Sequence, residues 1–363
     1  MTTTPVVRVL GELAHDSAHA RTVRCDCAPP LVLADRPDGT VVRSGPVVAK
    51  AHAPDTDAPA LAARRALAAA PGLAGILLAP LGAAAPAGRG GPSDVTGPGT
   101  GGAYAPSADA HTADARTADA RTAHGLTADP LTADGRTVSL WPYGEPVDPS
   151  DPDAAPWEEA ALLLARLHRT PPPHPLPPMR GPAKAARAVA RMCEARPGDP
   201  DTAPVLAAWR GLPAWARGED GAPPHARSGF LCHGDLHLGQ LVRHPAPHGP
   251  WVLIDIDDAG LGDPAWDLAR PAAWYAAGLL DPQVWLRFLD GYRSAGGPAV
   301  RATGDPWPDL DVPARALTVQ TAALALAKSA VQGRGPDEVE QMMIDACVRI
   351  ASLPPELTAE HAS

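Results

Sequence analysis

Residues 230–241 read FLCHGDLHLGQL, and this short stretch decides how the rest of the chain is interpreted. His233 and His237 lie four residues apart, with Asp235 between them and Gln240 shortly after. Such a set of side chains fits a metal site, a histidine base or some third kind of site. The surrounding sequence has to distinguish these three kinds of chemistry.

A zinc site is disfavoured by the glycines of this stretch. In a helix, His233 and His237 would share one face and could bind zinc. Gly234 and Gly239 argue against a helix, and the sequence shows no third ligand at a recognisable spacing. A hydrolase is also disfavoured, because Cys232 only adjoins His233 in sequence and no GxSxG motif is present.

Composition excludes several classes of protein. The chain has 363 residues and is 45% hydrophobic, which is enough for two packed lobes. Its formal charge of −10 argues against a nucleic-acid partner and is compatible with an amine-bearing small-molecule substrate. Five scattered cysteines without a CxxC pair disfavour a disulfide framework. We expect no signal peptide, no membrane span and a cytoplasmic location, and no pattern indicates an oligomeric state.

Short strands dominate the first part of the chain. We predict strands at 31–35, 40–43 and 47–52, joined as a meander by turn residues. The alanine-rich segment 60–70 predicts the first helix. GILLAPLG at 75–82 predicts a further strand.

A low-complexity insertion follows. Residues 83–110 are mostly Ala, Gly, Pro and Ser, and residues 111–135 repeat every five as HTADA RTADA RTAHG LTADP LTADG. A period of five matches neither helix nor strand, and the repeat offers little to bury. We therefore interpret about 83–136 as a disordered insertion, with a functional lid as the alternative.

Helices dominate the second part. The run WEEAALLLARLHR at 157–169 has acidic residues at its start, basic residues at its end and leucines on one face, which predicts a helix. Segments 182–195 and 201–217 also predict helices, and WVLIDID at 251–257 predicts an apolar strand.

Two helices are expected near the C-terminus. Asp311 is expected to cap the first, with Pro313 in its opening turn. The second is expected to bury one stripe of side chains: Val339, Met342, Ala346 and Ile350.

These elements predict an α+β protein with two lobes. Residues 1–140 would form a small β-rich N-lobe, 141–148 a connector, and 149–363 a larger α-helical C-lobe. We expect a cleft between the lobes to hold the residues of the 230–241 stretch.

The motif HGDLHLGQ, followed by LIDID at 253–257, resembles the catalytic and metal-binding loops of the aminoglycoside phosphotransferase-like small-molecule kinases. It is especially similar to the maltokinase and glucosamine-kinase branch. The resemblance continues in LLLARLHRTPP at 162–172 and GDPAWDLARPAAW at 262–274, and it spans about 140–290. It implies a bilobal protein-kinase-like fold and ATP-dependent phosphoryl transfer, with GTP as an alternative donor.

The same resemblance assigns roles to the motif residues. Asp235 would orient the acceptor hydroxyl and accept its proton, as phosphoryl transfer requires little further covalent help. Gln240 and Asp255 would bind Mg²⁺, which prefers oxygen ligands. His233 would brace the loop by hydrogen bonding, and Asp267 would hold the backbone amides of the loop.

Asp257 and Asp258 follow the metal aspartate and could contact the substrate or a second metal ion. In the N-lobe, Lys50 is the candidate for pairing with the α- and β-phosphates. The glutamate that usually partners this lysine on the following helix is missing, and Asp55 or Asp57 could replace it.

The connector would serve as the hinge, where Trp141 and Tyr143 meet the adenine. The sequence thus predicts a Mg²⁺- and ATP-dependent kinase acting on a hydroxyl of a small molecule, such as an aminoglycoside, aminosugar, sugar or macrolide. The alternative is a catalytically weak pseudokinase that binds a nucleotide or a partner. It is motivated by the missing glutamate and by the absence of a Walker sequence.

Overall fold

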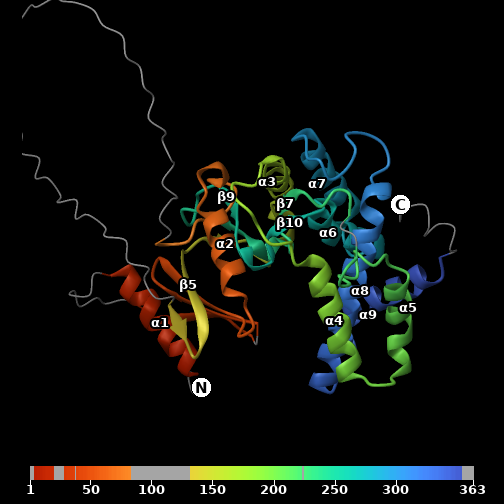
Figure 1. The fold of residues 1–363 in the computed structure, drawn as a ribbon, viewed down its shortest axis with the longest axis horizontal. Helices are drawn as coiled ribbons and strands as arrows, with labels where there is room; N and C mark the ends of the chain where they lie inside the picture. The colour runs from red at the N-terminus through yellow and green to blue at the C-terminus, as the bar shows by residue number, and fades with distance from the viewer. Residues whose placement is uncertain (1–3, 20–27, 37, 83–130, 223–224, 354–363) are drawn as a thin grey trace, which may run out of the picture.

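The fold was analysed in a computed structural model that describes residues 4–19, 28–36, 38–82, 131–222 and 225–353. A small antiparallel sheet with one helix lies at one side, and a larger helical body lies at the other (Figure 1). The predicted α+β architecture, with a β-rich part preceding a helical part, is therefore confirmed.

The small lobe is built on a five-stranded antiparallel sheet with the order β1-β2-β3-β5-β4. The three predicted strands of the meander are all present. The strands are β1 (Leu31–Arg36), β2 (Gly39–Ser44), β3 (Val47–His52), β4 (Thr132–Ala133) and β5 (Arg136–Pro142).

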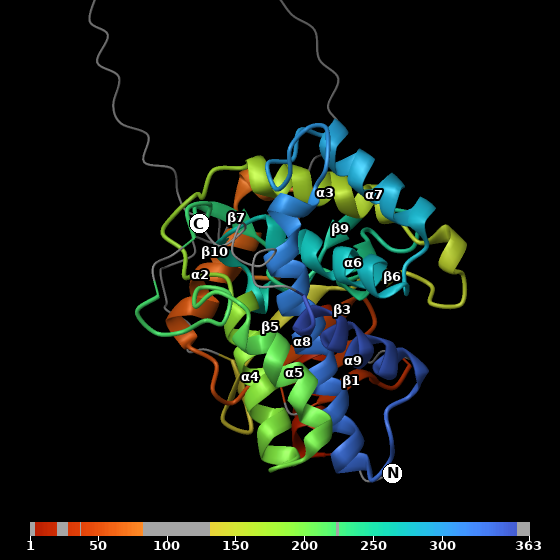
Figure 2. The same cartoon turned by 90° about the vertical axis from the view of Figure 1, so that its right-hand side faces the viewer.

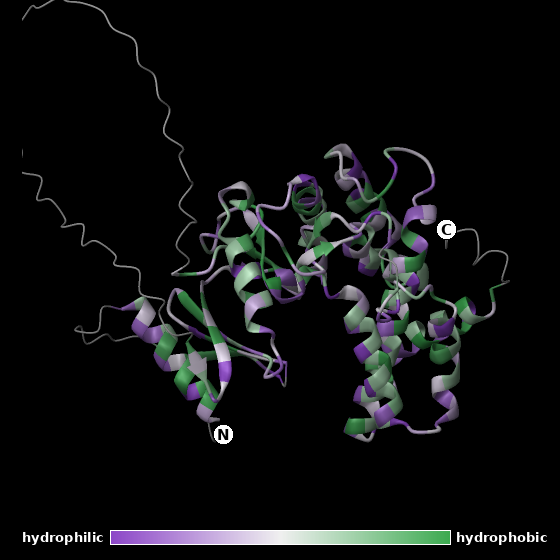
Figure 3. Ribbon diagram, viewed as in Figure 1, coloured by the Kyte–Doolittle hydropathy of each residue, from purple (hydrophilic) through white to green (hydrophobic). Residues whose placement is uncertain are grey.

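Helix α1 (Pro5–Ala18) covers this sheet and was not anticipated from the sequence. It buries Leu10 and Ala14 against Val42 and Ala49 of the strands. Figure 3 shows apolar and polar residues alternating along α1, as expected of a helix with one buried face. The small lobe therefore has a hydrophobic core of its own.

The segment after α2 (Ala58–Ala68) and η1 (Pro71–Leu73) does not form the strand predicted at 75–82. Its backbone bonds to both lobes instead: twice to Leu253 of β9, where Leu77 forms an isolated parallel bridge, and once to Leu140 of β5. Leu78 N donates to Leu253 O at 2.9 Å, and Leu81 N donates to Leu140 O at 2.8 Å. The apolar side chains are buried because the segment crosses between the lobes, and it touches a sheet only through the isolated bridge between Leu77 and Leu253.

Residues 83–130, which hold most of the predicted insertion, lie outside the described residues. The last repeat unit, LTADG at 131–135, is ordered, which corrects the predicted boundary at 136. It forms β4 and a tight turn in which Asp134 and Gly135 have φ values of 51° and 71°. Asp and Gly tolerate this left-handed backbone better than other residues, so the turn leads directly into β5.

The large lobe contains the predicted helices and two small sheets. Figures 1 and 2 both place α3 beside α7, and α4 beside α8. The helices are α3 (Trp157–Arg169), α4 (Gly181–Ala195), α5 (Ala203–Arg210), α6 (Ala265–Ala277), α7 (Pro282–Ser294), α8 (Trp307–Gln332) and α9 (Glu338–Ala351).

Two small sheets support the loops of the large lobe. One pairs β10 with β7, and the other has the order β6-β8-β9. The strands are β6 (Glu145–Pro146), β7 (Phe230–Cys232), β8 (Leu241–Arg243), β9 (Trp251–Leu253) and β10 (Gly260–Gly262). Short 3₁₀ turns are η2 (Pro152–Ala154), η3 (Pro200–Thr202), η4 (Leu238–Gln240) and η5 (Ile256–Asp258).

Several predicted element bounds were wrong. The helix predicted at 201–217 is shorter, since α5 ends at Arg210 with Gly211 as its C-cap, and a proline follows at 213. The strand predicted at 251–257 ends at Leu253, because Asp255 adopts a φ of 63° that no strand accommodates.

The two C-terminal helices also differ from prediction. Helix α8 begins at Trp307, so Pro313 lies inside it and Asp311 is not its cap. Asp311 accepts a hydrogen bond from Arg315 at 2.9 Å instead. In α9, Val339 is 57% exposed, since the helix packs against α5 and α8 through another face. That buried face consists of Met343, Ile344, Ala346 and Cys347.

No helix in the described part of the chain is long and apolar enough to cross a membrane.

The core of the large lobe centres on Tyr292 and Phe288, which are fully buried. The Tyr292 hydroxyl lies 2.8 Å from His168 Nδ1 and accepts a hydrogen bond from Ala299 N at 2.9 Å. This ring therefore links α3, α7 and the loop before α8.

We predict that Gly297→Ala destabilises the protein by about 1–3 kcal/mol, the usual cost of overpacking a core. A Cβ at Gly297 would overlap the Tyr292 ring, which has no room to move. The matched control is Gly229→Ala, because a Cβ there meets nothing within 4 Å. Chemical unfolding followed by tryptophan fluorescence checks both variants. Equal stability of the two variants would contradict the prediction.

Candidate functional site

A cavity of about 610 Å³ lies between the two lobes. Strands β1–β3 and helix α2 line it from one side, and α4, α6, α8 and the loops after β7 and β9 line it from the other. A second cavity of about 400 Å³ adjoins it and is largely apolar. The two cavities share Val41, Lys50, Asp255 and Asp257.

The buried carboxylate of Asp267 holds the start of the 233–240 loop. It accepts hydrogen bonds from His233 N at 2.6 Å and from Gly234 N at 2.7 Å. Its third contact is His168 Nε2 at 2.9 Å, and His168 in turn contacts Tyr292. Asp267 comes from α6, so one carboxylate fixes the loop to two helices.

His233 ties this loop to the next one. Its Nε2 donates to Ile254 O at 2.8 Å, directly before Asp255. Gly234 has a φ of 82°, and a Cβ there would overlap the carbonyl of Asp258, so only glycine fits. The two loops that carry the motif residues are therefore packed together through their backbones.

His233 and His237 do not share a helix face, because β7, a turn and η4 follow one another here. His237 Nδ1 accepts a hydrogen bond from Gly239 N at 3.1 Å, and burial lowers the pKa of His237 to about 4. Among the described residues, one buried group of metal-capable side chains occurs: His168, Cys232 and Asp267. In this group, His168 and Asp267 are already hydrogen-bonded to each other.

Asp235 lies between two cations. Its Oδ1 accepts from Arg270 at 2.6 Å, and its Oδ2 lies 2.7 Å from Lys184 Nζ. Burial raises the pKa of Asp235, but Lys184 and Arg270 outweigh it, so the pKa falls below its ordinary value of 3.8. The carboxylate is thus ionised at neutral pH. Each oxygen keeps a further lone pair for a hydroxyl group.

Gln240 and Asp255 line the same cavity and are joined through their backbones, since Ile254 N donates to Gln240 O at 2.9 Å. Gln240 is 8% exposed and lies in η4. Asp255 has the left-handed φ of 63°, a strained conformation that is found at functional sites. An amide oxygen and a carboxylate form a donor set that suits Mg²⁺.

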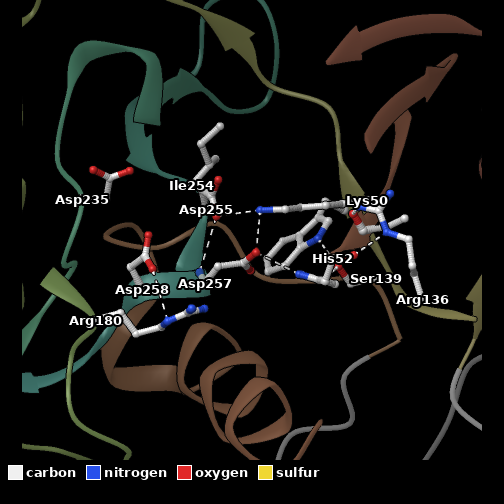
Figure 4. A network of polar contacts seen from close by, with 12 residues as sticks. Lys50, His52, Arg136, Ser139, Arg180, Asp235, Ile254, Asp255, Asp257 and Asp258 are labelled. Atoms are coloured by element: carbon white, nitrogen blue, oxygen red, sulfur yellow. Dashed lines mark hydrogen bonds and ion pairs between the residues drawn. The ribbon is translucent and has the colours of Figure 1, made fainter. Parts of the chain in front are cut away.

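Lys50 reaches both aspartates of the second loop (Figure 4). Its Nζ lies 2.7 Å from Asp255 Oδ1 and 3.0 Å from Asp257 Oδ2. Burial opposes the charge of Lys50, but the two carboxylates outweigh it and raise its pKa above the ordinary value. The same pairing, together with His52, lowers the pKa of Asp257 against the effect of burial.

Asp55 and Asp57 do not replace the missing glutamate. Asp57 caps α2 by accepting from Ala60 N at 2.7 Å, and Asp55 lies 3.5 Å from Arg187. Asp257 is the carboxylate that pairs with Lys50 where a glutamate was expected. A carboxylate from the large lobe therefore pairs with the lysine of the small lobe.

A polar network behind Lys50 was missed by the sequence reasoning. The fully buried His52 contacts Asp257 Oδ2 at 3.0 Å and Ser139 Oγ at 2.7 Å. Arg136 donates to His52 O at 2.6 Å (Figure 4). A histidine two residues after Lys50 on the same strand face was the available signal.

Helix α2 carries an arginine toward the large lobe. Arg64 is 4% exposed, and its Nε donates to Ala259 O at 2.7 Å. The helix that usually presents a glutamate to Lys50 thus presents a cation to a backbone carbonyl. The sequence shows Arg64 within the alanine-rich segment 60–70, but the direction of its side chain depends on how α2 packs.

Asp258 is paired with cations from α4 and its N-terminal cap. Lys184 Nζ lies 2.7 Å from Asp258 Oδ2, and Arg180 Nε lies 3.8 Å from its Oδ1. Burial raises the pKa of Asp258 despite Lys184. Neither Asp257 nor Asp258 offers an unpaired carboxylate to an amine.

Lys184 and Arg270 are site residues that the sequence patterns did not predict.

Trp141 and Tyr143 line the apolar cavity. The Trp141 indole Nε1 donates to Ser139 Oγ at 2.8 Å, and Tyr143 N donates to Pro46 O at 2.7 Å. Val48, Leu78 and Ile254 complete much of the apolar wall. A flat apolar ring fits such a lining, which adjoins the Lys50 side of the larger cavity.

Comparison with known proteins agrees with this architecture. A model of the phosphotransferase enzyme family matches residues 105–307, which is more than half of the chain. Among curated proteins, none matches significantly.

Solved structures share the fold. A thermostable mutant of the aminoglycoside phosphotransferase APH(4)-Ia, in ternary complex with AMP-PNP and hygromycin B, has a TM-score of 0.56 at 14% identity, with 97% of this chain and 100% of that chain covered. A choline/ethanolamine kinase family protein from Mesorhizobium loti has a TM-score of 0.53 at 12% identity, with 98% of each chain covered. Choline kinase LicA from Streptococcus pneumoniae has a TM-score of 0.53 at 12% identity, covering 95% and 98%. The predicted bilobal kinase-like fold is confirmed.

We predict that Asp267→Ala lowers stability by about 3 kcal/mol, because it leaves two buried amides and His168 without their acceptor. The matched control is Asp345→Ala on α9, where the exposed carboxylate accepts, among the residues that the structure describes, only from Gln341. Thermal and chemical unfolding check both. If Asp267→Ala proved as stable as Asp345→Ala, Asp267 would not be holding the loop.

Proposed function

Because the chain belongs to the phosphotransferase enzyme family, we propose that it transfers the γ-phosphate of ATP to a hydroxyl group of a small molecule. One observation carries this proposal. Asp235, Gln240 and Asp255 line one cavity opposite Lys50, and an apolar cavity adjoins it at Lys50. Phosphoryl transfer needs this combination of an aligned hydroxyl, charge neutralisation and a nucleotide site.

The nucleotide base would occupy the apolar cavity beside Trp141 and Tyr143, with residues 141–148 as the hinge between an N-lobe at 1–140 and a C-lobe at 149–363. Lys50 would then contact the phosphates. It is charged at neutral pH, because its carboxylate partners raise its pKa. GTP remains the alternative donor. The AMP-PNP in the complex of the related phosphotransferase supports a nucleoside triphosphate.

Gln240 and Asp255 would hold Mg²⁺, which neutralises phosphate charge when bound. Asp257 is a candidate for a second metal contact, but Lys50 and His52 occupy it here. His233 and Asp267 would act indirectly, by fixing the backbone from which these side chains project.

Asp235 would orient the acceptor hydroxyl and receive its proton as the new O–P bond forms and the bond to ADP breaks. Its lowered pKa makes it a weak base that stays ionised. This suits a loose transition state in which the attacking oxygen has bonded little to phosphorus, so that a strong base is not needed. Lys184 and Arg270 keep the carboxylate fixed from two sides.

We predict that Asp235→Asn lowers kcat by about 10²- to 10⁴-fold, the usual contribution of a positioned base. Its melting temperature should stay close to that of the wild type, since the side chain is not part of the core. ADP formation with a panel of sugars, aminosugars, aminoglycosides and macrolides measures the effect. Asp345→Asn, an exposed change on α9, is the control. Full turnover in a folded Asp235→Asn protein would remove Asp235 from the mechanism.

We predict that Asp255→Ala abolishes the magnesium dependence of nucleotide binding. In the wild type, Mg·AMP-PNP should raise the melting temperature, and EDTA should reduce that rise, because a ligand that binds the folded state stabilises it by mass action. In the variant, magnesium and EDTA should give the same small shift. Unchanged magnesium dependence would contradict the role of Asp255. No shift in the wild type with either ATP or GTP would favour the pseudokinase alternative.

A further inference from the structure

We propose that the acceptor of this enzyme carries an anionic group, a carboxylate or a phosphate, which binds a basic stripe on α4. The basic stripe consists of Arg180, Lys184, Arg187 and Arg191. This inference rests on the proposed phosphotransferase function and concerns its substrate class.

The basic stripe follows the helical period. Its members are spaced by four, three and four residues, which places them on one face of α4. The opposite face packs into the helical core through Ala185, Val189 and Met192. All four basic side chains line the 610 Å³ cavity that also holds Asp235.

Two members of the stripe are largely available to a ligand. Arg191 is exposed and has no ion pair or hydrogen bond within the part of the chain that the structure describes. Arg187 has one long contact, at 3.5 Å from an Asp55 side chain that is 65% exposed. Such an exposed pair contributes little and is readily exchanged for a bound anion.

A second observation points to a polar ligand in the same place. Gln320 of α8 lines the cavity beside α4 and is 4% exposed. Its side-chain amide makes no hydrogen bond to any of the described residues. Although the residue as a whole is 4% exposed, its amide atoms are not enclosed by protein, so they can bind a ligand atom in the cavity.

The aspartates of the cavity do not favour a cationic acceptor. Asp235 is held by Lys184 and Arg270, and Asp258 by Lys184. Asp257 is held by Lys50. Eight Arg or Lys side chains and seven Asp side chains line this cavity, although the whole chain has a formal charge of −10. The lining is therefore close to neutral where the chain as a whole is acidic, and the side chains of the basic stripe that are available to a ligand are cations, so the cavity does not favour the expected amine-bearing substrate.

The helix sets the size of the acceptor. Lys184 contacts Asp235, and the rise of about 1.5 Å per residue puts Arg187 about 4.5 Å and Arg191 about 10.5 Å further along the axis. The anionic group would therefore lie on the order of 5–10 Å from the reacting hydroxyl. A monosaccharide acid or a monosaccharide phosphate spans this range.

The test compares glucuronate, glucose 6-phosphate, glucose and glucosamine as ligands of the full chain, with and without Mg·AMP-PNP, at one ionic strength. We expect the two acidic compounds to raise the melting temperature more than the neutral and cationic ones. The compound that gives the larger rise in melting temperature, glucuronate or glucose 6-phosphate, shows whether the stripe prefers a carboxylate or a phosphate. Arg187→Gln/Arg191→Gln should weaken binding of the acidic compound about tenfold, the value of one charge-assisted hydrogen bond.

Arg349→Gln on α9 is the matched control, since Arg349 does not line the cavity and should leave the shifts as in the wild type. The inference is overturned if glucosamine raises the melting temperature more than the acidic compounds do, or if the acidic compounds do not raise it at all. It is also overturned if the acidic compounds raise the melting temperature of the wild type and of the double variant equally. A double variant that loses the Mg·AMP-PNP shift would assign the stripe to the nucleotide and also overturn it. Absence of any Mg·AMP-PNP shift in the wild type counts against the proposed function alone, because the acidic ligands are also measured without nucleotide.

Discussion

The buried carboxylate of Asp267 is the interaction on which the site depends. It accepts from two consecutive backbone amides at the start of the 233–240 loop and contacts His168 of α3. Two amide donors and one imidazole partner compensate for removing a charge from water. Since His233 then binds the carbonyl of Ile254, the position of Asp235 and that of Asp255 both follow from one buried group.

The contact between the lobes is also electrostatic, but both carboxylates that pair with the lysine of the small lobe come from the large lobe. Lys50 of the small lobe pairs with Asp255 and Asp257 of the large lobe. Helix α2 contributes Arg64 to a backbone carbonyl instead of a carboxylate to the lysine. The missing glutamate therefore does not leave the lysine unpaired.

Sequence patterns predicted the part of the site that lies close together along the chain. The HGD motif, Gln240 and Asp255 occur within about two dozen residues, and their chemistry restricts the residue types. Lys50 and Asp257 are 207 positions apart, so no local pattern could join them. The spacing of the α4 cations was visible, but the face that meets the cavity is decided by packing. Segment 75–82 has the composition of a strand, yet it pairs only briefly with Leu253 of β9 before Leu81 bonds to β5 of the other lobe.

That crossing segment has a consequence for motion. Residues 76 and 78 bond to Leu253 of β9, and β6 of the connector pairs with β8, so two separate stretches of chain reach one three-stranded sheet. Lys50 and Arg64 join the lobes elsewhere, through their side chains. A lone connector would leave the lobes free to swivel about it, whereas these further attachments restrain such a swivel.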